Sequence, residues 1–187
     1  MNFKPLLAVL ALALSSLAAP AATVVLTAVG QAQVGQGLDL QLSINDPFSG
    51  LAPDEELLSF GFRLGYDTSK LSFASFTVAA GWDDDSGWLG AGQFGGSSFP
   101  GVANHGQAKL LLGTLHFDAL QAGQALVSLS TDAGNLNHGL GFLWSGAQPL
   151  NTALNLAVST VPEPASVLLA GIGLGLVGWA RRYGRQA

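Results

Sequence analysis

The residues best suited to chemistry lie in one short segment, Trp82-Asp-Asp-Asp-Ser-Gly-Trp88. Its consecutive carboxylates, Asp83, Asp84 and Asp85, repel one another unless water or a cation neutralises them, and oxygen ligands of this kind suit Ca²⁺. The two tryptophans could instead present their rings to sugar faces. Because the segment lacks the spacing of an EF-hand loop, three interpretations stay open: calcium held by Asp83 and Asp85, a ligand loop at Trp82 and Trp88, or a solvated loop, which is favoured.

A second acidic run, Asp54-Glu-Glu56, follows Pro53 in a shorter loop and is typical of a solvated surface turn. A glycosidase needs two carboxylates at set separations across a cleft, and the sequence cannot fix the separation of any pair among the eleven acidic residues of the domain. The chain also lacks a Gly-x-Ser-x-Gly nucleophile elbow. We therefore predict that the protein is not an enzyme, with a secreted hydrolase as a remote alternative.

The remaining residues give little support to metal or redox chemistry. The chain has no cysteine, which excludes thiolate catalysis, Cys-ligated zinc and disulfides. The three histidines, His105, His116 and His138, have no His-x-His or His-x-x-x-His spacing. Zinc is therefore not expected, and His116 is predicted to face solvent from a strand. No cofactor follows beyond the Ca²⁺ that stays open at Asp83 and Asp85.

The end of the chain combines three features in a fixed order. Pro162-Glu163-Pro164 comes first, an apolar run of 16 residues from Ala165 to Ala180 follows, and basic residues close the chain: Arg181, Arg182 and Arg185. A helix of that length spans roughly 24 Å at 1.5 Å per residue, so it must thin the bilayer or let its flanks snorkel. Because positive charges stay cytoplasmic, everything before Pro162 is expected outside.

This order of motif, helix and basic tail resembles the PEP-CTERM sorting signal of Gram-negative bacteria that make exopolysaccharide. The resemblance implies recognition by an exosortase, a membrane cysteine protease or transpeptidase that removes the tail, with this chain as the substrate. It also implies transient anchoring in the inner membrane with the body in the periplasm, followed by delivery to the cell surface or an extracellular biofilm matrix. A permanent C-terminal anchor is the alternative.

The start of the chain is predicted to be a secretory signal peptide, residues 1–21. Met1–Lys4 supplies the positive start, Leu6–Leu14 is a short apolar stretch, and Ala19 and Ala21 are small residues suited to signal peptidase. Cleavage is expected after Ala21, with Ala18 as the alternative. Residues 161–187 form the sorting signal, so one domain remains between the two ends.

That domain, Ala22–Thr160, is strongly acidic. It holds eleven acidic residues and three Lys or Arg residues, which give a formal charge of −8 against −5 for the whole chain. Nucleic acid and anionic membrane surfaces are therefore poor partners. A domain of this size can bury a core, and without disulfides it must be stabilised by packing alone.

The domain is predicted to be all-β, an antiparallel sandwich or jelly roll. Short stretches of alternating apolar and polar residues are separated by Gly, Asp, Asn and Pro, and none shows a helical period. Gly81 to Gly106, with eight glycines, is expected to be a long loop that is functional or mobile. We expect about eight strands, over residues 23–29, 38–44, 60–66, 71–78, 109–117, 126–130, 141–144 and 153–158.

The stretch Leu58–Phe73 resembles the cohesin pattern, in which a strand ends in Tyr-Asp-Pro and the next begins with Leu-x-Phe. Here the residues are Tyr66, Asp67 and Leu71-Ser-Phe73, with Thr68 where proline is usual. The resemblance implies a nine-stranded jelly roll and, in cohesins, dockerin binding, although nothing here matches a dockerin-contact surface. Asp67 is expected to close its turn by accepting backbone N–H groups two residues on. A structural or adhesive role in the matrix is predicted, with a carbohydrate- or protein-binding module as the alternative.

Overall fold

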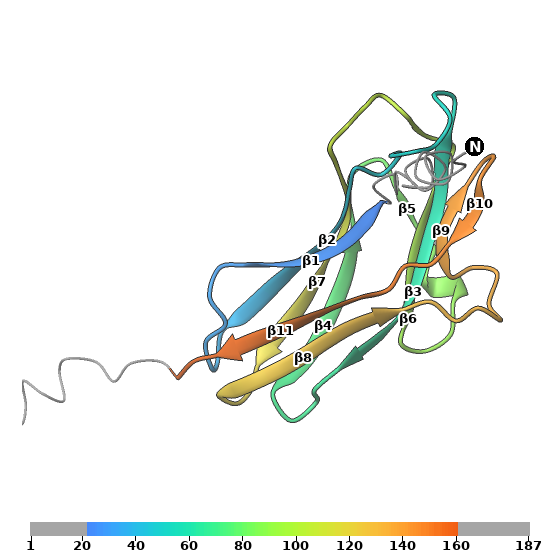
Figure 1. Ribbon diagram of the computed structural model, residues 1–187. Coiled ribbons are helices and arrows are strands. Elements are labelled where there is room, and N and C mark those ends of the chain that lie inside the picture. Colours follow the sequence, from blue (N-terminus) through green and yellow to red (C-terminus); the bar gives the residue numbers. More distant parts are fainter. Residues whose placement is uncertain (1–21, 161–187) are drawn as a thin grey trace, which may run out of the picture.

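The computed structural model describes residues 22–160, which form two antiparallel sheets packed face to face (Figure 1). One sheet has the order β1-β2-β7-β4, built from Thr23–Val29, Gly37–Asn45, Lys109–Ala119 and Leu71–Val78. The other has the order β10-β9-β3-β6-β5, and β8 joins it by pairing with both β3 and β11. Its strands are β3 Glu56–Tyr66, β5 Asp83–Asp84, β6 Gln93–Ala103, β8 Gly123–Ser130, β9 Gly139–Phe142, β10 Gly146–Gln148 and β11 Thr152–Val158.

The core lies between the two sheets and follows the alternation of the sequence. On β2, Leu38, Leu40 and Leu42 are buried, because alternate side chains of a strand point to the same face. Aromatic rings fill the centre, with Phe62 edge-on to Phe76 at 5.4 Å between ring centroids. Such pairs add about 0.5–1.5 kcal/mol beyond the burial of their area. The two facing antiparallel sheets confirm the prediction of an all-β sandwich.

The turn after β3 forms as the sequence predicts. The Asp67 carboxylate accepts hydrogen bonds from the backbone N–H of Ser69 at 2.9 Å and from its hydroxyl at 2.7 Å. These bonds hold the pKa of Asp67 below its usual range. The Tyr66 ring packs against Phe117, with ring centroids 5.4 Å apart. Both residues therefore act in the scaffold that joins β3 to β4.

The prediction of one long loop between Gly81 and Gly106 is wrong. This stretch contains β5, a short 3-10 helix, η1 (Ser86–Trp88), and the eleven-residue strand β6. The sequence did not indicate this strand because Gly95 and Gly96, near its start, have no side chains and break the alternation. Both glycines are buried, and β6 pairs along most of β3. The expected strand at 141–144 is also displaced: β9 ends at Phe142, and Trp144 lies in the turn to β10 (Gly146–Gln148).

The prediction of a solvated turn at Asp54–Glu56 is wrong for its central residue. Glu55 is only 1% exposed. Its carboxylate accepts the backbone N–H of Trp144 at 2.8 Å, and the N–H and hydroxyl of Ser145 at 3.0 and 2.5 Å. Burial raises the pKa of Glu55, but the hydrogen bonds from Ser145, Trp144 and Glu56 outweigh it and leave the pKa below its ordinary value. This carboxylate organises the β9–β10 turn.

The predicted ends of the chain lie outside the described residues. These are the signal peptide with Ala19 and Ala21, the Pro162–Pro164 motif, the apolar run and the arginine tail. Within residues 22–160, no helix has the length and apolar character needed to cross a membrane. The division of the chain at residues 21 and 160 stays a prediction.

Candidate binding cleft

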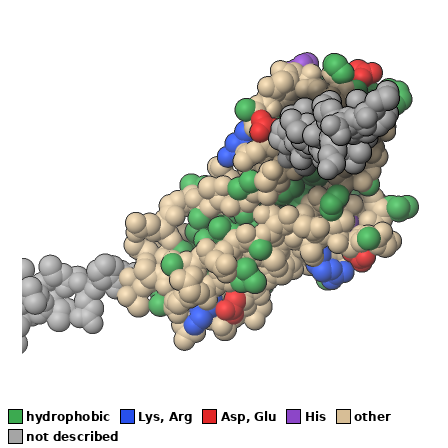
Figure 2. All heavy atoms as spheres, viewed as in Figure 1, with side chains coloured by type: hydrophobic (Ala, Val, Ile, Leu, Met, Phe, Trp, Pro, Cys, Tyr) green, Lys and Arg blue, Asp and Glu red, His purple; other side chains and the backbone are tan. Residues whose placement is uncertain are grey.

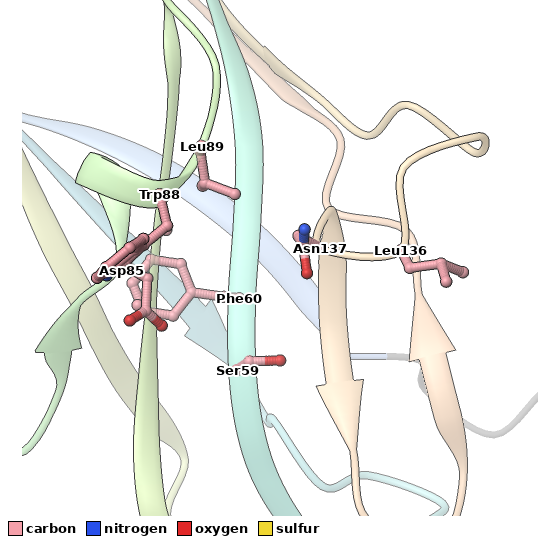
Figure 3. A pocket seen from close by; sticks show the side chains of 9 residues that line it. Ser59, Phe60, Asp85, Trp88, Leu89, Leu136 and Asn137 are labelled. Atoms are coloured by element: carbon pink, nitrogen blue, oxygen red, sulfur yellow. The ribbon is translucent and has the colours of Figure 1, made fainter.

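A cleft of about 250 Å³ opens at one end of the larger sheet, between two segments far apart in the sequence (Figure 3). The segment from β5 through η1 forms one wall, and the β8–β9 loop forms the other. Strands β3 and β6 run between them. The lining residues are Ser59, Phe60, Asp85, Trp88, Leu89, Gly95, Gly96, Leu136 and Asn137.

The first wall is fixed to β6 by a small network of hydrogen bonds. The Asp84 carboxylate accepts the backbone N–H of Ser86 at 2.9 Å, and the Ser86 hydroxyl contacts both the carbonyl and the N–H of Gly95, at 3.4 and 3.3 Å. The N–H of Trp88 donates to the carbonyl of Asp85 at 2.9 Å. This tight turn projects the Trp88 side chain outward, where it is 89% exposed.

The prediction that both tryptophans present their rings to a ligand is wrong for Trp82. Its ring is buried, 7% exposed, and meets Phe60 edge-on with ring centroids 5.0 Å apart. Trp82 precedes the β5 pairing, so its side chain enters the core while the chain beyond it passes along β6. Trp82 therefore anchors the first wall, and only Trp88 reaches solvent.

Glycines form the floor of the cleft. A Cβ on Gly95 would lie 2.5 Å from the carbonyl oxygen of Phe60, and one on Gly96 would lie 2.9 Å from the carbonyl oxygen of Asp83. Real Cβ atoms do not approach backbone atoms so closely, so these positions require glycine. The consequence is a floor of bare backbone between the two walls.

The second wall is held by a histidine and a glutamine. The Nε2 of His138 is 2.8 Å from the Gln93 side-chain oxygen on β6, and its Nδ1 accepts the backbone N–H of Asp132 at 3.1 Å. Because Nδ1 is an acceptor here, the ring is neutral with its proton on Nε2. Asn135 donates to the same Gln93 oxygen at 3.1 Å and accepts the backbone N–H of Asn137 at 3.0 Å. Together these bonds place Asn137 beside the floor.

The electrostatics of the two walls differ. His138 is 4% exposed, and burial lowers its pKa; nearby Asp132 opposes this effect and Arg63 adds to it. Asp85 brings the one formal charge among the lining residues. Within residues 22–160, no hydrogen bond occupies the side chains of Asp85, Ser59 or Asn137, so all three are available to a ligand.

The described part of the chain contains no preformed metal site. Among residues 22–160, no group of three or more Asp, Glu or His side chains is placed to hold an ion. Calcium at Asp83 and Asp85 stays a prediction. The other histidines lie apart from the cleft: His116 contacts Asp39 at 2.7 Å on the smaller sheet, with 34% of its side chain exposed, and His105 follows β6.

Sequence reasoning therefore found half of the cleft. It singled out the stretch that supplies Asp85 and Trp88, but it missed Ser59, Asn137 and the glycine floor. Pairing between β3 and β6 brings Ser59 opposite Ser97 and Gly61 opposite Gly95. The only local signals were the Gly95-Gly96 pair and the closely spaced Asn135 and Asn137.

Comparison with known protein families identifies the end of the chain. Residues 160–186 match the PEP-CTERM protein-sorting motif. The matched segment contains Pro162, Glu163 and Pro164 together with the arginine tail. The motif marks an exported protein with a membrane-anchoring C-terminal sorting signal that an exosortase processes. No curated protein sequence matches the chain significantly.

Comparison with solved structures identifies the fold of the body. The cohesin module of a family 33 glycoside hydrolase from Clostridium perfringens matches with a TM-score of 0.56 and 14% identity, over 75% of this chain and 98% of that module. The sixth cohesin of scaffoldin B from Acetivibrio cellulolyticus, in complex with a dockerin, gives a TM-score of 0.47 at 14% identity, over 76% and 100% of the two chains. A type I cohesin from Pseudobacteroides cellulosolvens gives 0.45 at 13% identity, over 77% and 96%. The first of these carries the assignment of a cohesin-like fold.

Proposed function

We propose that this chain, a cohesin-like body followed by a PEP-CTERM sorting motif, is exported and processed by an exosortase to work at the cell surface or in the extracellular matrix. Its role there is structural or adhesive, in an exopolysaccharide-rich or biofilm matrix. The observation that carries the proposal is the motif at residues 160–186, which begins directly after β11 ends at Val158. The tail of the folded body thus leads straight into the sorting signal.

The arrangement of the fold supports a tethered role. β11 ends beside the β7–β8 turn at one end of the sandwich, and the cleft walls, η1 and the β8–β9 loop, lie at the other (Figure 1). An attachment made beyond residue 160 would therefore leave the cleft end of the body pointing away from the tether.

The charge of the surface supports an extracellular setting in which the body does not bind nucleic acid or anionic lipid surfaces. The body carries a formal charge of −8, and on the face seen in Figure 2 charged side chains are few and scattered among uncharged ones. A negative domain is repelled by phosphate-rich surfaces and stays soluble. Uncharged polar surface is compatible with a hydrated polysaccharide environment.

The proposal is tested by the intact mass of the protein recovered from a host that contains an exosortase. Wild-type protein is expected to begin at Ala22 and to lack the segment after the Pro-Glu-Pro motif. A variant with Pro162, Glu163 and Pro164 all replaced by alanine is expected to keep residues 165–187 and to stay in the membrane fraction. Recovery of wild-type protein with the full tail would contradict sorting.

A second candidate is a non-catalytic binding module for a carbohydrate or protein, and the cleft with its exposed Trp88 favours it. Tryptophan is enriched among the residues that dominate the energy of binding interfaces. A hydrolase remains the remote alternative. A screen of the purified protein against glycan and ester substrates is expected to show no turnover, and turnover would overturn the non-catalytic assignment.

A further inference from the structure

We infer that the cleft between η1 and the β8–β9 loop binds a single ring of a neutral saccharide, with Trp88 as its stacking platform and Asp85, Ser59 and Asn137 as its hydrogen-bonding groups. This inference deepens the proposed function, since it names the ligand class that the exported body would bind in the matrix. It does not depend on how the C-terminus is processed.

The first support is the state of Trp88. Its side chain is 89% exposed, yet the backbone beneath it is held by hydrogen bonds through Asp85 and Ser86. Within residues 22–160, no aromatic ring packs against it. An indole combines a broad apolar face with one N–H donor. Its natural partner is a ligand with an apolar C–H face and a polar rim, which describes a pyranose ring.

The second support is the set of polar side chains that line the cleft, Asp85 on the side of Trp88 and Ser59 and Asn137 on the side of the β8–β9 loop (Figure 3). Asp85 offers two acceptor oxygens, Ser59 a hydroxyl that donates and accepts, and Asn137 an amide that does both. No hydrogen bond within residues 22–160 uses these three side chains. Sugar hydroxyls also donate and accept, so a saccharide in the cleft can pair with groups of this kind on either wall. Small-molecule sites commonly combine apolar surface with a few such convergent polar groups.

The third support is the size and rigidity of the cleft. Its volume of about 250 Å³ lies just below the range of roughly 300–1,000 Å³ typical of drug-sized ligands. Gly95 and Gly96 let β5 and β3 pack closely against β6, which makes the floor rigid. Gln93 fixes the second wall by accepting hydrogen bonds from Asn135 and His138. Little ordering is then needed on binding, which favours affinity.

Charge selects the kind of saccharide. No Lys or Arg lines the cleft, and Asp85 adds a negative charge to a body already at −8. A uronic acid or a sulfated sugar would be repelled, whereas a neutral ring meets no such penalty. A cationic peptide could also use Asp85 and the Trp88 face, but Asp85 is the one carboxylate among the lining residues, which gives a highly charged peptide little complementary charge. The observations therefore favour the neutral saccharide.

The test uses the full chain purified in detergent and an array of neutral oligosaccharides that includes tetramers of glucose, mannose and N-acetylglucosamine. Tetragalacturonate and hexa-arginine serve as the anionic and cationic probes. Binding of the array hits is then measured by calorimetry. We expect at least one neutral oligosaccharide to bind, and neither charged probe to do so.

Variants locate the site. Trp88→Ala is expected to weaken binding at least tenfold, and Asn137→Ala several-fold. Trp144→Ala is the matched control, because Trp144 is also exposed, at 67%, but does not line the cleft. It should leave affinity unchanged, and all variants should keep the wild-type melting curve.

Three outcomes would overturn the inference: no neutral oligosaccharide bound at millimolar concentration, unchanged affinity in Trp88→Ala, or binding of hexa-arginine alone. None of these would touch the sorting proposal, which the mass of the recovered protein tests separately. Conversely, an unprocessed tail together with intact saccharide binding would contradict the sorting proposal and leave the saccharide-binding proposal standing.

Discussion

Two acidic runs, at residues 54–56 and 83–85, look alike in the sequence but reach opposite environments. In the first, Glu55 is 1% exposed and accepts hydrogen bonds from Trp144 and Ser145 on the β9–β10 turn. In the second, Asp84 holds the N–H of Ser86, while Asp85 lines an open cleft without a hydrogen bond to its side chain within residues 22–160.

The difference shows that the number of donors meeting a carboxylate decides its role. Burying a charge is costly unless hydrogen bonds replace its water, and Glu55 meets several backbone and hydroxyl donors at once. Where the chain supplies one donor or none, the carboxylate stays solvated. The first run is therefore part of the scaffold, whereas the second supplies a group that a ligand can use.

The strongest test of this contrast is Glu55→Ala. The backbone N–H groups of Trp144 and Ser145 would lose their acceptor, which should lower the free energy of unfolding by about 2–3 kcal/mol. Denaturant unfolding measures this loss. Asp54→Ala, which removes an exposed neighbouring carboxylate, should change it by less than about 0.5 kcal/mol. Equal effects in both variants would erase the distinction.

Acid should also reveal the buried carboxylate. The pKa of Glu55 is lowered in the folded state, so at acid pH the unfolded chain binds the proton more readily. Its contribution is complete above the ordinary pKa of glutamate, about 4.3, and is lost as the pH falls through the folded-state pKa. Comparing unfolding free energies of wild type and Glu55→Gln between about pH 6 and 3 tests this; parallel curves would count against it.

The support beneath the second run is tested by Gly95→Ala. The new Cβ would meet the carbonyl oxygen of Phe60 at 2.5 Å, and such overpacking costs about 1–3 kcal/mol. The strand would also shift where Ser86 and Asp85 bond to it. Gly87→Ala is the control, because a Cβ there has nothing within 4 Å. A melting temperature lowered equally by both would contradict the close approach.

The contribution of His138, in the cleft wall formed by the β8–β9 loop, to folding stability should depend on pH in the neutral range. The lowered pKa of His138 means that the unfolded ring takes up a proton before the folded one does. Stability is complete above the ordinary histidine pKa, about 6.5, and falls as the pH drops toward the folded-state value. Urea midpoints between about pH 8 and 5.5 should decline in wild type and His105→Asn, but less in His138→Gln.

The smallest expected effect is that of Asp84→Ala. Removing the acceptor of the Ser86 N–H should lower the free energy of unfolding by about 0.5–1 kcal/mol and speed hydrogen exchange at that amide. Asp83→Ala removes a neighbouring exposed carboxylate and should leave the Ser86 amide unchanged. Unaltered exchange in Asp84→Ala would show that the turn is held by the Ser86–Gly95 contacts alone.

The strands could be predicted where apolar side chains recur between turn residues, and β1 (Thr23–Val29) has the predicted bounds. β4 (Leu71–Val78) has the predicted bounds, and β2 differs from its prediction by one residue at each end. β6 was missed because two glycines near its start remove the pattern; its pairing with β3, not its local sequence, makes it a strand. The cleft was half predicted for the same reason: Asp85 and Trp88 share one segment, whereas Asn137 arrives from another.

The sequence by itself determined the features that depend on linear order. A Pro-Glu-Pro motif, an apolar run and an arginine tail define a sorting signal without any tertiary contact, and alternation defines most of the strands. Only the tertiary structure decided that Glu55 is buried, that Trp82 is buried while Trp88 is exposed, and that His138 supports one wall of the cleft. Each of these depends on donors or surfaces from distant positions, 89 residues away for the Trp144 N–H bound to Glu55 and 45 for the contact between His138 and Gln93.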